Sequence, residues 1–426
     1  MDHLLAAAEQ FASPSPILEV WEYGSGNVND TFLVTLDGAE EKHIILQRLN
    51  ARVFPQPELI MGNLGTMSDH LARRLRQTPL PPGRRWEAPR VLCARDGRDH
   101  WISPDGSFWR ALSFIDGAET FDTIKNPAQA REVGYALGLF HNLLSDLPPE
   151  RLADTLPGFH ITPLYLKHYD EVWAGRGFWE RGPGAVGRLQ SLSQTLSPNP
   201  HKGGGQGDGE ALRAAPPRGL RARRPRPYGS PARPSGPPPV PSPELDYCLK
   251  FIEARRGGAS VLEEAKAQGK LALRVIHGDP KVNNVMLDVV TGRAVALVDL
   301  DTVKPGLVHY DIGDCLRSGA NPQGEETEDW ETVRFEPEAG RAILTGYLSQ
   351  ARDFFTQVDY DYLYDAVGLI AFELGLRFFT DFLEGNVYFK VRHREHNLIR
   401  ALVQFKLTES IESQETALRG IIGDLR

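Results

Sequence analysis

The N-terminal part of the chain carries short apolar runs rich in β-branched and aromatic side chains, a pattern that predicts strands. The expected strands cover residues 17–23, 31–36 and 43–49. Asp37-Gly38 favours a hairpin turn between the last two. From Pro57 to Leu75 apolar residues recur at close to a helical period, which predicts a helix. Another strand pair is expected on either side of the turn at 104–106, so this part is predicted to be a small sheet with one helix.

After Asp116-Gly117 the apolar positions follow longer periods that predict helices. Asn126-Pro127 is typical of a helix start, and this helix is expected to reach about Leu144. Further helices are expected over residues 163–196, 245–268 and 340–426, and short strands over 273–276, 285–287 and 295–300. The order of elements predicts an α+β, bilobed protein with a β-rich lobe over residues 1–115 and a mostly helical lobe over residues 116–426.

Residues 203–243 differ in composition from the rest of the chain. They hold 11 prolines, 7 arginines, two acidic residues and no lysine. One interpretation is a disordered or polyproline-like linker. A second is a frameshifted or erroneous stretch that replaces a helical piece, because Gly, Ala, Pro and Arg have GC-rich codons; a packed helix over 210–235 would contradict it. A third is a functional basic patch.

Composition limits the classes of function. The 426 residues are 41% hydrophobic and 24% charged, which is typical of a globular protein, and the net charge of −8 argues against a broad surface for nucleic acid or anionic membranes. Cys93, Cys248 and Cys315 lie far apart and are interpreted as reduced thiols. The chain shows neither a signal-peptide pattern nor an apolar stretch of transmembrane length. We expect a soluble cytoplasmic protein with a small-molecule partner, while the sequence leaves the oligomeric state open.

The densest chemical signal is the run His277-Gly-Asp-Pro-Lys-Val-Asn-Asn284. Phosphoryl transfer needs a carboxylate that orients and deprotonates the attacking hydroxyl, and the run resembles a protein-kinase catalytic loop. Asp279 is therefore the predicted catalytic base. Lys281 is expected to contact the transferred phosphoryl group or the Asp279 carboxylate, and His277 to brace the loop. Asp311 and Asp314 are candidates to organise the loop by hydrogen bonds.

The same reaction needs oxygen ligands for a divalent ion, and Mg²⁺ prefers few protein ligands of carboxylate or amide type. Asn284 lies five residues after Asp279, and Asp299-Leu-Asp301 follows fifteen residues later. We predict Asn284 and Asp299 as ligands of Mg²⁺, and Asp301 as an auxiliary ligand or a supporting group. Each of these residues alone also fits an ordinary turn or strand cap, so the prediction depends on the whole set at its spacing.

A glycine-rich turn in the first lobe is the candidate nucleotide site, since backbone N–H groups in such a turn can approach phosphates. A plain hairpin is the competing interpretation. A kinase-like third strand would carry a lysine, but here it reads Ile44-Ile-Leu-Gln-Arg-Leu49, so Gln47 or Arg48 is the substitute, with Glu58 as a possible partner. Alternation along a strand allows only one of the two to face inward. The candidate nucleotide-binding residues are Gly24, Gly26, Asn27, Thr31, Gln47 and Arg48.

Polar residues among the apolar helical positions of the second lobe are candidates for binding the acceptor. The main candidates are Arg317, Arg377, Asp381 and Tyr388, with Asn321, His396, Asn397 and Arg400 as further polar groups. For each of them, hydrogen bonding to a polyhydroxylated substrate competes with a salt bridge between helices.

The chain resembles the aminoglycoside phosphotransferase/choline kinase superfamily, and within it most closely the N-acetylhexosamine 1-kinase group. The blocks that carry the resemblance are Gly26–Phe32, Ile45–Asn50, Lys281–Asn284, Val298–Leu307, Tyr310–Asp314 and Arg377–Gly385. The resemblance implies a protein-kinase-like fold, ATP and Mg²⁺ as cofactors, and phosphorylation of the anomeric hydroxyl of an N-acetylhexosamine. It also implies that residues 115–118 form the hinge that presents backbone groups to adenine. Gly278 and Pro280 depart from the group's pattern, so a different loop geometry is expected.

Two other functions compete with a sugar kinase. A kinase for an amino alcohol such as choline or an aminoglycoside would carry an acidic or aromatic cation-binding pocket, whereas Arg317, Arg377 and Arg400 favour a sugar. A pseudokinase that binds partners is the other alternative, and the intact Asp279 and Asp299 argue against it.

Overall fold

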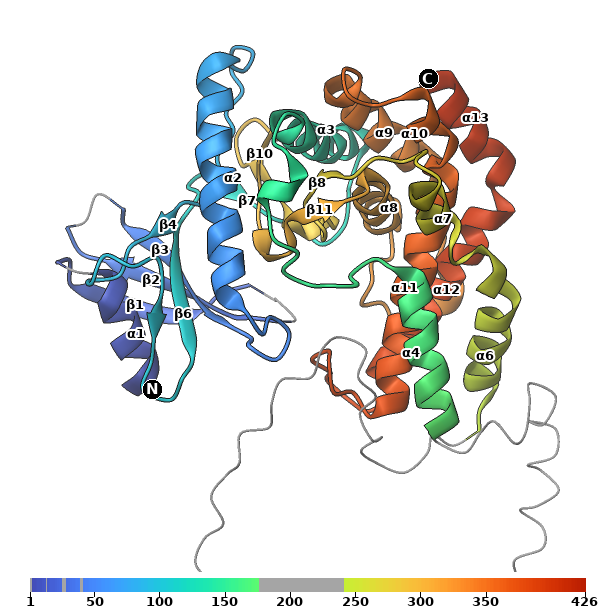
Figure 1. Ribbon diagram of the computed structural model, residues 1–426, viewed down its shortest axis with the longest axis horizontal. Helices are drawn as coiled ribbons and strands as arrows, with labels where there is room; N and C mark the ends of the chain where they lie inside the picture. The colour runs from blue at the N-terminus through green and yellow to red at the C-terminus, as the bar shows by residue number, and fades with distance from the viewer. Residues whose placement is uncertain (1, 13, 25–27, 39–40, 176–240) are drawn as a thin grey trace, which may run out of the picture.

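The structure is a computed structural model that describes residues 2–12, 14–24, 28–38, 41–175 and 241–426. A β-rich lobe and a larger helical lobe lie side by side, which confirms the predicted α+β, bilobed architecture (Figure 1). Nothing in the structure tests the boundary at 115, which stays a prediction. Most of the Pro/Arg-rich segment and the expected helical stretch beyond residue 175 lie outside the described residues.

The N-terminal lobe is an antiparallel sheet packed on one helix. Its neighbouring strands, in order, are β1 (Ile17–Glu22), β2 (Asp30–Leu36), β3 (His43–Leu49), β6 (Phe108–Ser113) and β4 (Val91–Leu92), and β5 (Trp101–Ile102) also pairs with β6. Helix α1 (Asp2–Ala12) covers one face, where Phe11 packs in one cluster with Ile44 and Leu46. Because side chains alternate along β3, Ile45 and Gln47 point to the other face.

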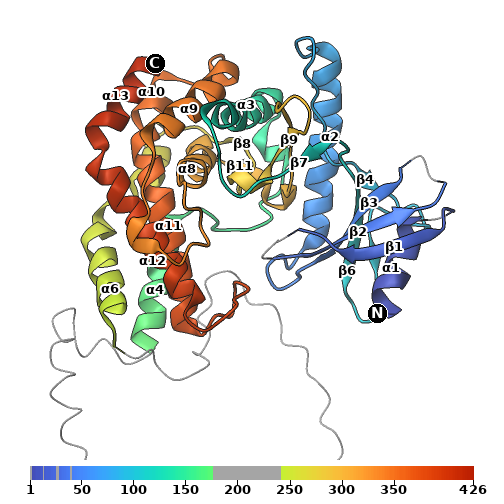
Figure 2. The same ribbon diagram turned by 180° about the vertical axis from the view of Figure 1, so that it is seen from behind.

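Helix α2 (Pro57–Gln77) stands between the two lobes, as both views of the ribbon show (Figures 1 and 2). Its apolar period is buried at Ile60, Leu64 and Met67, which confirms the predicted helix. The amide of Asn63 donates to the carbonyl oxygen of Val303 at 2.9 Å. This contact ties α2 to the segment that follows the predicted metal ligands.

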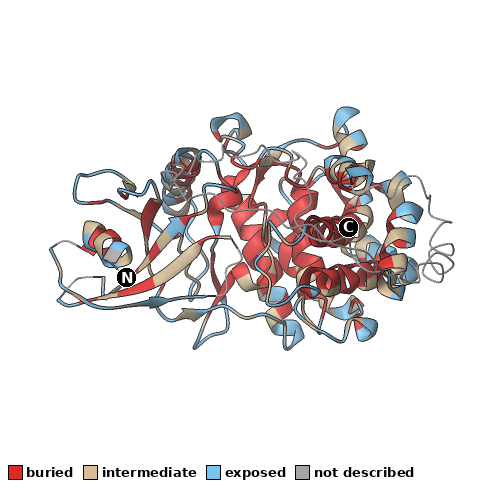
Figure 3. Cartoon of the chain, turned by 90° about the horizontal axis from the view of Figure 1, so that it is seen from below, coloured by how far each residue is buried: buried red, intermediate tan, exposed pale blue. Residues whose placement is uncertain are grey.

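The C-terminal lobe is built from helices around a continuous apolar core. The buried residues of these helices are red in Figure 3. Its helices are α3 (Pro127–Leu144), α4 (Thr162–Gly175), α6 (Pro243–Arg255), α7 (Val261–Ala267), α8 (Val308–Gly319), α9 (Pro337–Ala351), α10 (Gln357–Asp361), α11 (Leu363–Glu384), α12 (His396–Ser413) and α13 (Glu415–Leu425). The side chain of Asn126 accepts a hydrogen bond from the N–H of Gln129 and so caps α3, as predicted. The described part of the chain has no helix that is both long and apolar enough to cross a membrane.

Helices α3 and α9 cross with their backbones in contact. A Cβ atom at Gly134 would lie 1.8 Å from the carbonyl oxygen of Ile343, and one at Gly346 would lie 1.9 Å from that of Arg131. Gly138 is less tight but still has no room for a side chain, since its Cβ would lie 2.4 Å from a backbone oxygen of α9. Glycine is therefore the residue that permits this approach at all three positions.

Two small sheets lie between α2 and α8 (Figures 1 and 2). Strand β8 (Arg274–Ile276) pairs with β11 (Lys304–Gly306), while β9 (Val285–Asp288) pairs with β10 (Ala294–Leu297) and β7 (Ala118–Glu119). The loop between β8 and β9 carries the predicted base. The turn between β10 and β11 carries the two predicted metal-site aspartates.

Two predicted elements end earlier than expected. The helix predicted over 245–268 breaks after Arg255, at a 3₁₀ turn over Arg256–Gly258 whose two glycines disfavour a continuous helix. The strand predicted over 295–300 ends at Leu297. Asp299 takes the left-handed conformation, with φ of 63°, which turns the chain out of the strand.

Candidate active site

Asp311 and Thr302 are two of the side chains that hold the backbone of the catalytic loop, residues 277–284. The buried carboxylate of Asp311 in α8 accepts hydrogen bonds from the N–H groups of His277 and Gly278, at 2.7 and 2.9 Å. The hydroxyl of Thr302 donates to the carbonyl oxygen of His277 at 2.8 Å. Gly278 has φ of 88°, and a Cβ atom there would lie 2.6 Å from the carbonyl oxygen of Thr302. This loop therefore requires glycine at 278.

The imidazole of His277 braces the loop, in agreement with its predicted role. Its Nε2 lies 3.0 Å from the carbonyl oxygen of Val298 and must donate to it. Its Nδ1 accepts from the N–H of Asp279 at 3.2 Å. Burial lowers the pKa of His277, which keeps the ring neutral. Both ring nitrogens are engaged by backbone groups, so the ring orients Asp279.

Asp279 is paired with the lysine two residues along the loop. One carboxylate oxygen of Asp279 accepts from Lys281 Nζ at 2.8 Å and from the amide of Asn284 at 3.3 Å. Desolvation would raise the pKa of Asp279, but the charge and hydrogen bond of Lys281 outweigh it and hold the pKa below its ordinary value. Of the two roles predicted for Lys281, the structure shows the contact with the carboxylate. Asp279 is thus an ionised acceptor at neutral pH.

The predicted metal ligands Asn284 and Asp299 lie close to this pair. Asn284 uses its side-chain nitrogen on the backbone oxygen of Asp279, at 2.7 Å, which leaves its side-chain oxygen as the possible metal ligand. Asp299 is exposed. Desolvation by the surrounding protein and the charge of Asp301 raise the pKa of Asp299 to about 6. A cation at this carboxylate would relieve both effects.

The predicted ligands, Asn284 and Asp299, suit Mg²⁺ better than a metal ion that is held by protein side chains alone. One carboxylate and one amide oxygen are what Mg²⁺ takes from a protein when phosphates and water complete its shell. No cluster of three or more His, Cys, Asp or Glu side chains that could hold a metal occurs among the described residues. The residues present therefore suit an ion that arrives with a nucleotide.

Asp301 is engaged by residues of the N-terminal lobe. One of its oxygens forms an ion pair with Arg110 of β6, and the other accepts from the amide of Asn29 at 2.7 Å. Arg110 also donates to the Gln47 side-chain oxygen at 2.7 and 3.0 Å, and Gln47 donates to the Thr31 hydroxyl at 3.1 Å. These contacts fit the supporting role predicted for Asp301. Its role as an auxiliary metal ligand stays a prediction.

The alternation on β3 places the two nucleotide-site candidates of that strand on opposite faces of the sheet. Gln47 belongs to the network that reaches Asp301, whereas Arg48 points to the opposite face, where its guanidinium lies 5.8 Å from the Trp109 ring and pairs with Asp30. Arg48 is 47% exposed. The prediction that Arg48 faces the nucleotide is therefore not favoured, because it lies on the same side as α1.

The glycine-rich turn is described only in part. Gly24 has φ of 77°, a conformation that favours glycine, and Thr31 lies in β2. Gly26 and Asn27 lie outside the described residues, so their predicted contacts with a nucleotide stay predictions.

Arg377 of α11 lies among aromatic rings. Its guanidinium carbon is 4.9 Å from the ring centre of Phe159, 5.3 Å from that of Tyr165, 6.0 Å from that of Tyr388 and 5.5 Å from that of Phe389. These distances are typical of cation–π contacts. Two predicted acceptor residues, Arg377 and Tyr388, are thus brought together.

Asp381 has a different role from the one predicted. Its two oxygens accept from the backbone N–H groups of Val387, Tyr388 and Phe389, at 2.8, 2.8 and 3.0 Å. The amide of Asn397 donates to it as well, at 2.8 Å. The side chain is 3% exposed, and burial raises its pKa despite these donors. Asp381 anchors the loop after α11, so its oxygens are not open to a substrate.

Arg317 is buried in α8 and is held by two acids. Its Nε donates to Asp314 and its Nη1 to Glu325, both at 2.8 Å. Its positive charge also contributes to the low pKa of Asp279. The structure therefore places Arg317 near the base, and a direct contact with the acceptor stays a prediction.

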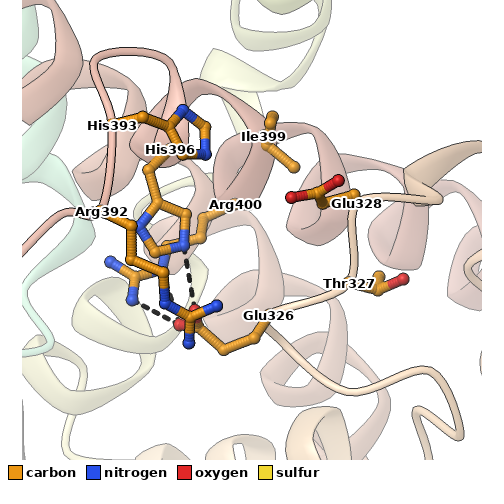
Figure 4. Close-up of a pocket in the computed structure, with 8 residues that line it drawn as sticks. All are labelled: Glu326, Thr327, Glu328, Arg392, His393, His396, Ile399 and Arg400. Carbon is orange, nitrogen blue, oxygen red and sulfur yellow. Dashed lines mark hydrogen bonds and ion pairs between the residues drawn. The ribbon is translucent and has the colours of Figure 1, made fainter.

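A polar pocket lies beside this region, between the loop before α9 and the start of α12 (Figure 4). Its lining residues are Glu326, Thr327, Glu328, Arg392, His393, His396, Ile399 and Arg400. Glu326 is its centre, since Arg400 Nε, His396 Nε2 and Arg392 Nη2 lie 2.7, 2.9 and 3.4 Å from its carboxylate. For His396 and Arg400 the structure thus shows the ion-pair alternative.

Sequence reasoning missed three residues of the site. Asn29 and Arg110 reach Asp301 from 272 and 191 positions away. His160 reaches the catalytic loop from 118 positions away. A local motif could have revealed none of these contacts, because both partners must be placed by the fold.

Comparison with known proteins gives the family. The model of the phosphotransferase enzyme family, APH, matches residues 19–347 of this chain. Among solved structures, a microcompartment-associated aminopropanol kinase is similar at 16% identity and a TM-score of 0.53, over 97% of this chain and 98% of that chain. At this identity the likeness shows the fold alone.

Two other solved structures are similar at lower TM-scores. Choline kinase from Cryptosporidium parvum Iowa II shares 15% identity over 95% of this chain and 91% of that chain, with a TM-score of 0.46. An aminoglycoside phosphotransferase from Alicyclobacillus acidocaldarius shares 13% identity over 99% and 95%, with a TM-score of 0.48.

Proposed function

This chain belongs to the phosphotransferase enzyme family, and from that premise we propose that it transfers the terminal phosphoryl group of ATP to the anomeric hydroxyl of an N-acetylhexosamine. The predicted phosphotransferase and its superfamily are confirmed by the family match. The sugar, the nucleotide and Mg²⁺ belong to the proposal.

The catalytic residues supply orientation and charge. The ionised Asp279 accepts the hydrogen bond of the attacking hydroxyl and takes its proton as the phosphoryl group is transferred. Lys281 neutralises Asp279 and stands next to the transferred group. Asn284 and Asp299 would hold Mg²⁺, which screens the charge of the phosphates when bound.

The aromatic rings around Arg377 are the observation that favours one class of acceptor over the other. Aromatic rings that recognise a quaternary or primary ammonium must be open to the ligand cation. Here the rings of Phe159, Tyr165, Tyr388 and Phe389 already surround the guanidinium of Arg377. A cationic acceptor would meet like charge at this place, whereas the hydroxyl and amide oxygens of an N-acetylated sugar would find a donor. This favours a neutral sugar over an amino alcohol.

The test compares acceptors that differ in one group. The protein is mixed with ATP, Mg²⁺ and N-acetylglucosamine or N-acetylgalactosamine, and ADP release is followed. The matched control acceptor is the methyl glycoside, which has every hydroxyl except the anomeric one. We expect turnover with the free sugar, none with the glycoside, and a sugar 1-phosphate in the phosphorus NMR spectrum. Faster turnover with choline or ethanolamine would overturn the choice of acceptor.

A variant sharpens the same test. Arg377→Met keeps the bulk among the rings and removes the charge. Since a hydrogen bond to a charged group contributes about 1.5–3 kcal/mol, kcat/KM for the sugar should fall roughly 10- to 100-fold. The amino alcohols should lose nothing. An equal loss for both acceptor classes would show that Arg377 only supports the fold.

A further inference from the structure

Residues 153–162, the central strap, lead from the 3₁₀ turn Pro149–Arg151 into α4. They contact the metal-site turn (residues 298–302), the catalytic loop and the side chain of Arg377. In Figure 1 this segment runs in green across the molecule towards α4. The hydroxyl of Thr155 donates to the backbone oxygen of Asp301 at 2.8 Å. Lys304 Nζ binds the Asp154 carboxylate at 2.8 Å and the Leu156 carbonyl oxygen at 3.0 Å. The strap is therefore tied to the metal-site turn at one end.

At its other end the strap grips the catalytic loop through His160. Nε2 of His160 lies 2.6 Å from the carbonyl oxygen of Gly278, the residue before Asp279. Nδ1 lies 2.9 Å from a carboxylate oxygen of Glu373 in α11. The other oxygen of Glu373 accepts from the hydroxyl of Thr162 at 2.7 Å. His160 and Glu373 are 4% and 1% exposed, so this pair lies inside the lobe.

The contacts require that the imidazole is charged. A carbonyl oxygen and a carboxylate can only accept, so both ring nitrogens of His160 must donate. Desolvation lowers the pKa of His160, but the charge and hydrogen bond of Glu373 outweigh it, and the pKa is raised above its ordinary value. The catalytic loop is thus held by an imidazolium.

The backbone of His160 is held in an unusual conformation. Its φ is 65°, in the left-handed region that residues other than glycine seldom take. Such strain persists only where the surroundings hold it, and it occurs more often at functional sites than elsewhere. The adjacent Phe159 is one of the rings around Arg377, 4.9 Å from its guanidinium carbon. One dipeptide therefore touches both the loop of the base and the proposed acceptor pocket.

We propose that His160 is a positioning residue of the phosphoryl transfer, which fixes the Gly278 carbonyl and thereby the direction of the Asp279 carboxylate. Through Phe159 the same strap links the acceptor pocket to the base. The inference deepens the proposed function and rests on Asp279 as the base, but it does not depend on which hydroxyl is the acceptor.

The first test uses His160→Gln with a matched control. His309→Gln removes a comparable buried imidazole, which is 1% exposed and binds the carbonyl oxygen of Asp359, a residue outside the catalytic loop, at 2.9 Å. Both variants should lower the melting temperature. Only His160→Gln should lower kcat, by roughly 10- to 100-fold, because a small misplacement of a reacting group has effects of that size. The affinity for ADP should stay unchanged in both.

A double-mutant cycle and a pH profile separate positioning from packing. Glu373→Gln should lower kcat as His160→Gln does, and the double variant should be no worse than the worse single one. The titratable groups that face His160 are Glu373 of α11, Asp314 and Tyr310 of α8, and behind Tyr310 the carboxylate of Glu263 in α7. In the unmodified protein kcat should fall as pH rises through the pKa of His160. His160→Gln should lack that descent.

Two results would overturn the proposal: a kcat in His160→Gln equal to that in His309→Gln, or a double variant whose losses multiply. If no acceptor supports turnover in the unmodified protein, the proposed function fails, and backbone hydrogen exchange then decides. Faster exchange at residues 277–279 in His160→Gln, with unchanged exchange there in His309→Gln, supports positioning. Unchanged exchange in both contradicts it.

Discussion

The catalytic loop and the metal-site turn, residues 298–302, each present an aspartate, and they treat its charge in opposite ways. In the loop, Lys281 balances Asp279 at 2.8 Å and keeps its pKa low. In the turn, Asp299 lies near a second carboxylate, that of Asp301, and its pKa is raised to about 6. Within the loop, the positive charge of Lys281 therefore balances the negative charge of Asp279. The turn carries a negative charge that a bound cation would balance.

Replacement of the balanced carboxylate should have the largest effect on the reaction. Asp279→Asn removes the group that takes the proton, and kcat should fall about 10²- to 10⁴-fold. ADP binding with Mg²⁺ should persist, because the ligands Asn284 and Asp299 are untouched. ADP release and a calorimetric titration measure the two quantities. A variant that retains most of its activity would show that the proton is taken elsewhere.

Replacement of Asp299, the carboxylate without a balancing cation, should change the response of the protein to Mg²⁺. Asp299→Asn should abolish the rise in melting temperature that Mg²⁺ with ADP gives, because stabilisation by a ligand follows its affinity. Asp301→Asn is the matched variant, one carboxylate in the same turn. It should weaken the contact with Arg110 and keep a response to Mg²⁺. An equal loss of the response in both variants would make Asp301 a ligand as well.

Asp311, which holds the backbone of the catalytic loop, gives a prediction on how stability depends on pH. Burial raises the pKa of Asp311, but the hydrogen bond and charge of His141 and the other donors outweigh it, so the pKa lies below its ordinary value. A lowered folded pKa contributes stability that is present above the unfolded pKa and is lost as pH falls through the folded one. Asp311→Asn should therefore cost about 3 kcal/mol at pH 7.

Urea unfolding between pH 7 and pH 3 measures this effect. The difference in stability between the unmodified protein and Asp311→Asn should shrink as the pH falls. A difference that stays constant would mean that the lost contacts do not depend on the charge of Asp311.

The smallest effects concern the N-terminal partners of the metal-site turn. Gln47→Ala removes the acceptor of Arg110, which pairs with Asp301, and should raise the KM for ATP by up to about tenfold, since a hydrogen bond to a charged group is lost. Arg48→Ala changes the next residue, whose pair with Asp30 is exposed, and should alter stability by less than about 1 kcal/mol and leave KM unchanged. The reverse order of effects would contradict the assignment of the two faces.

Local signals in the sequence sufficed for the two lobes, for helices with clear caps and periods, and for the loop that carries Asp279. Asp279, Lys281 and Asn284 lie within one short run, so their neighbourhood follows from the chain itself. The strand pattern also showed that Gln47 and Arg48 face opposite ways, although the sheet was needed to tell which faces Asp301.

Other assignments depend on partners that only the folded chain brings together. Asp381 looked like a substrate ligand, but its oxygens bind backbone N–H groups of the following loop, which a side-chain pattern cannot reveal. His160 and Arg110 meet their partners across more than a hundred residues. Such contacts have no spacing rule in the sequence.

The close crossing of α3 and α9 has a consequence for the behaviour of the enzyme on heating. Helices in backbone contact at Gly134, Gly138 and Gly346 cannot slide past each other in small steps. Helix α3 carries His141, whose Nε2 lies 2.9 Å from the carboxylate of Asp311. Asp311 holds the backbone of the catalytic loop, so the position of the loop depends on that crossing. Activity should therefore persist up to the temperature at which the whole lobe melts, without a gradual decline before it.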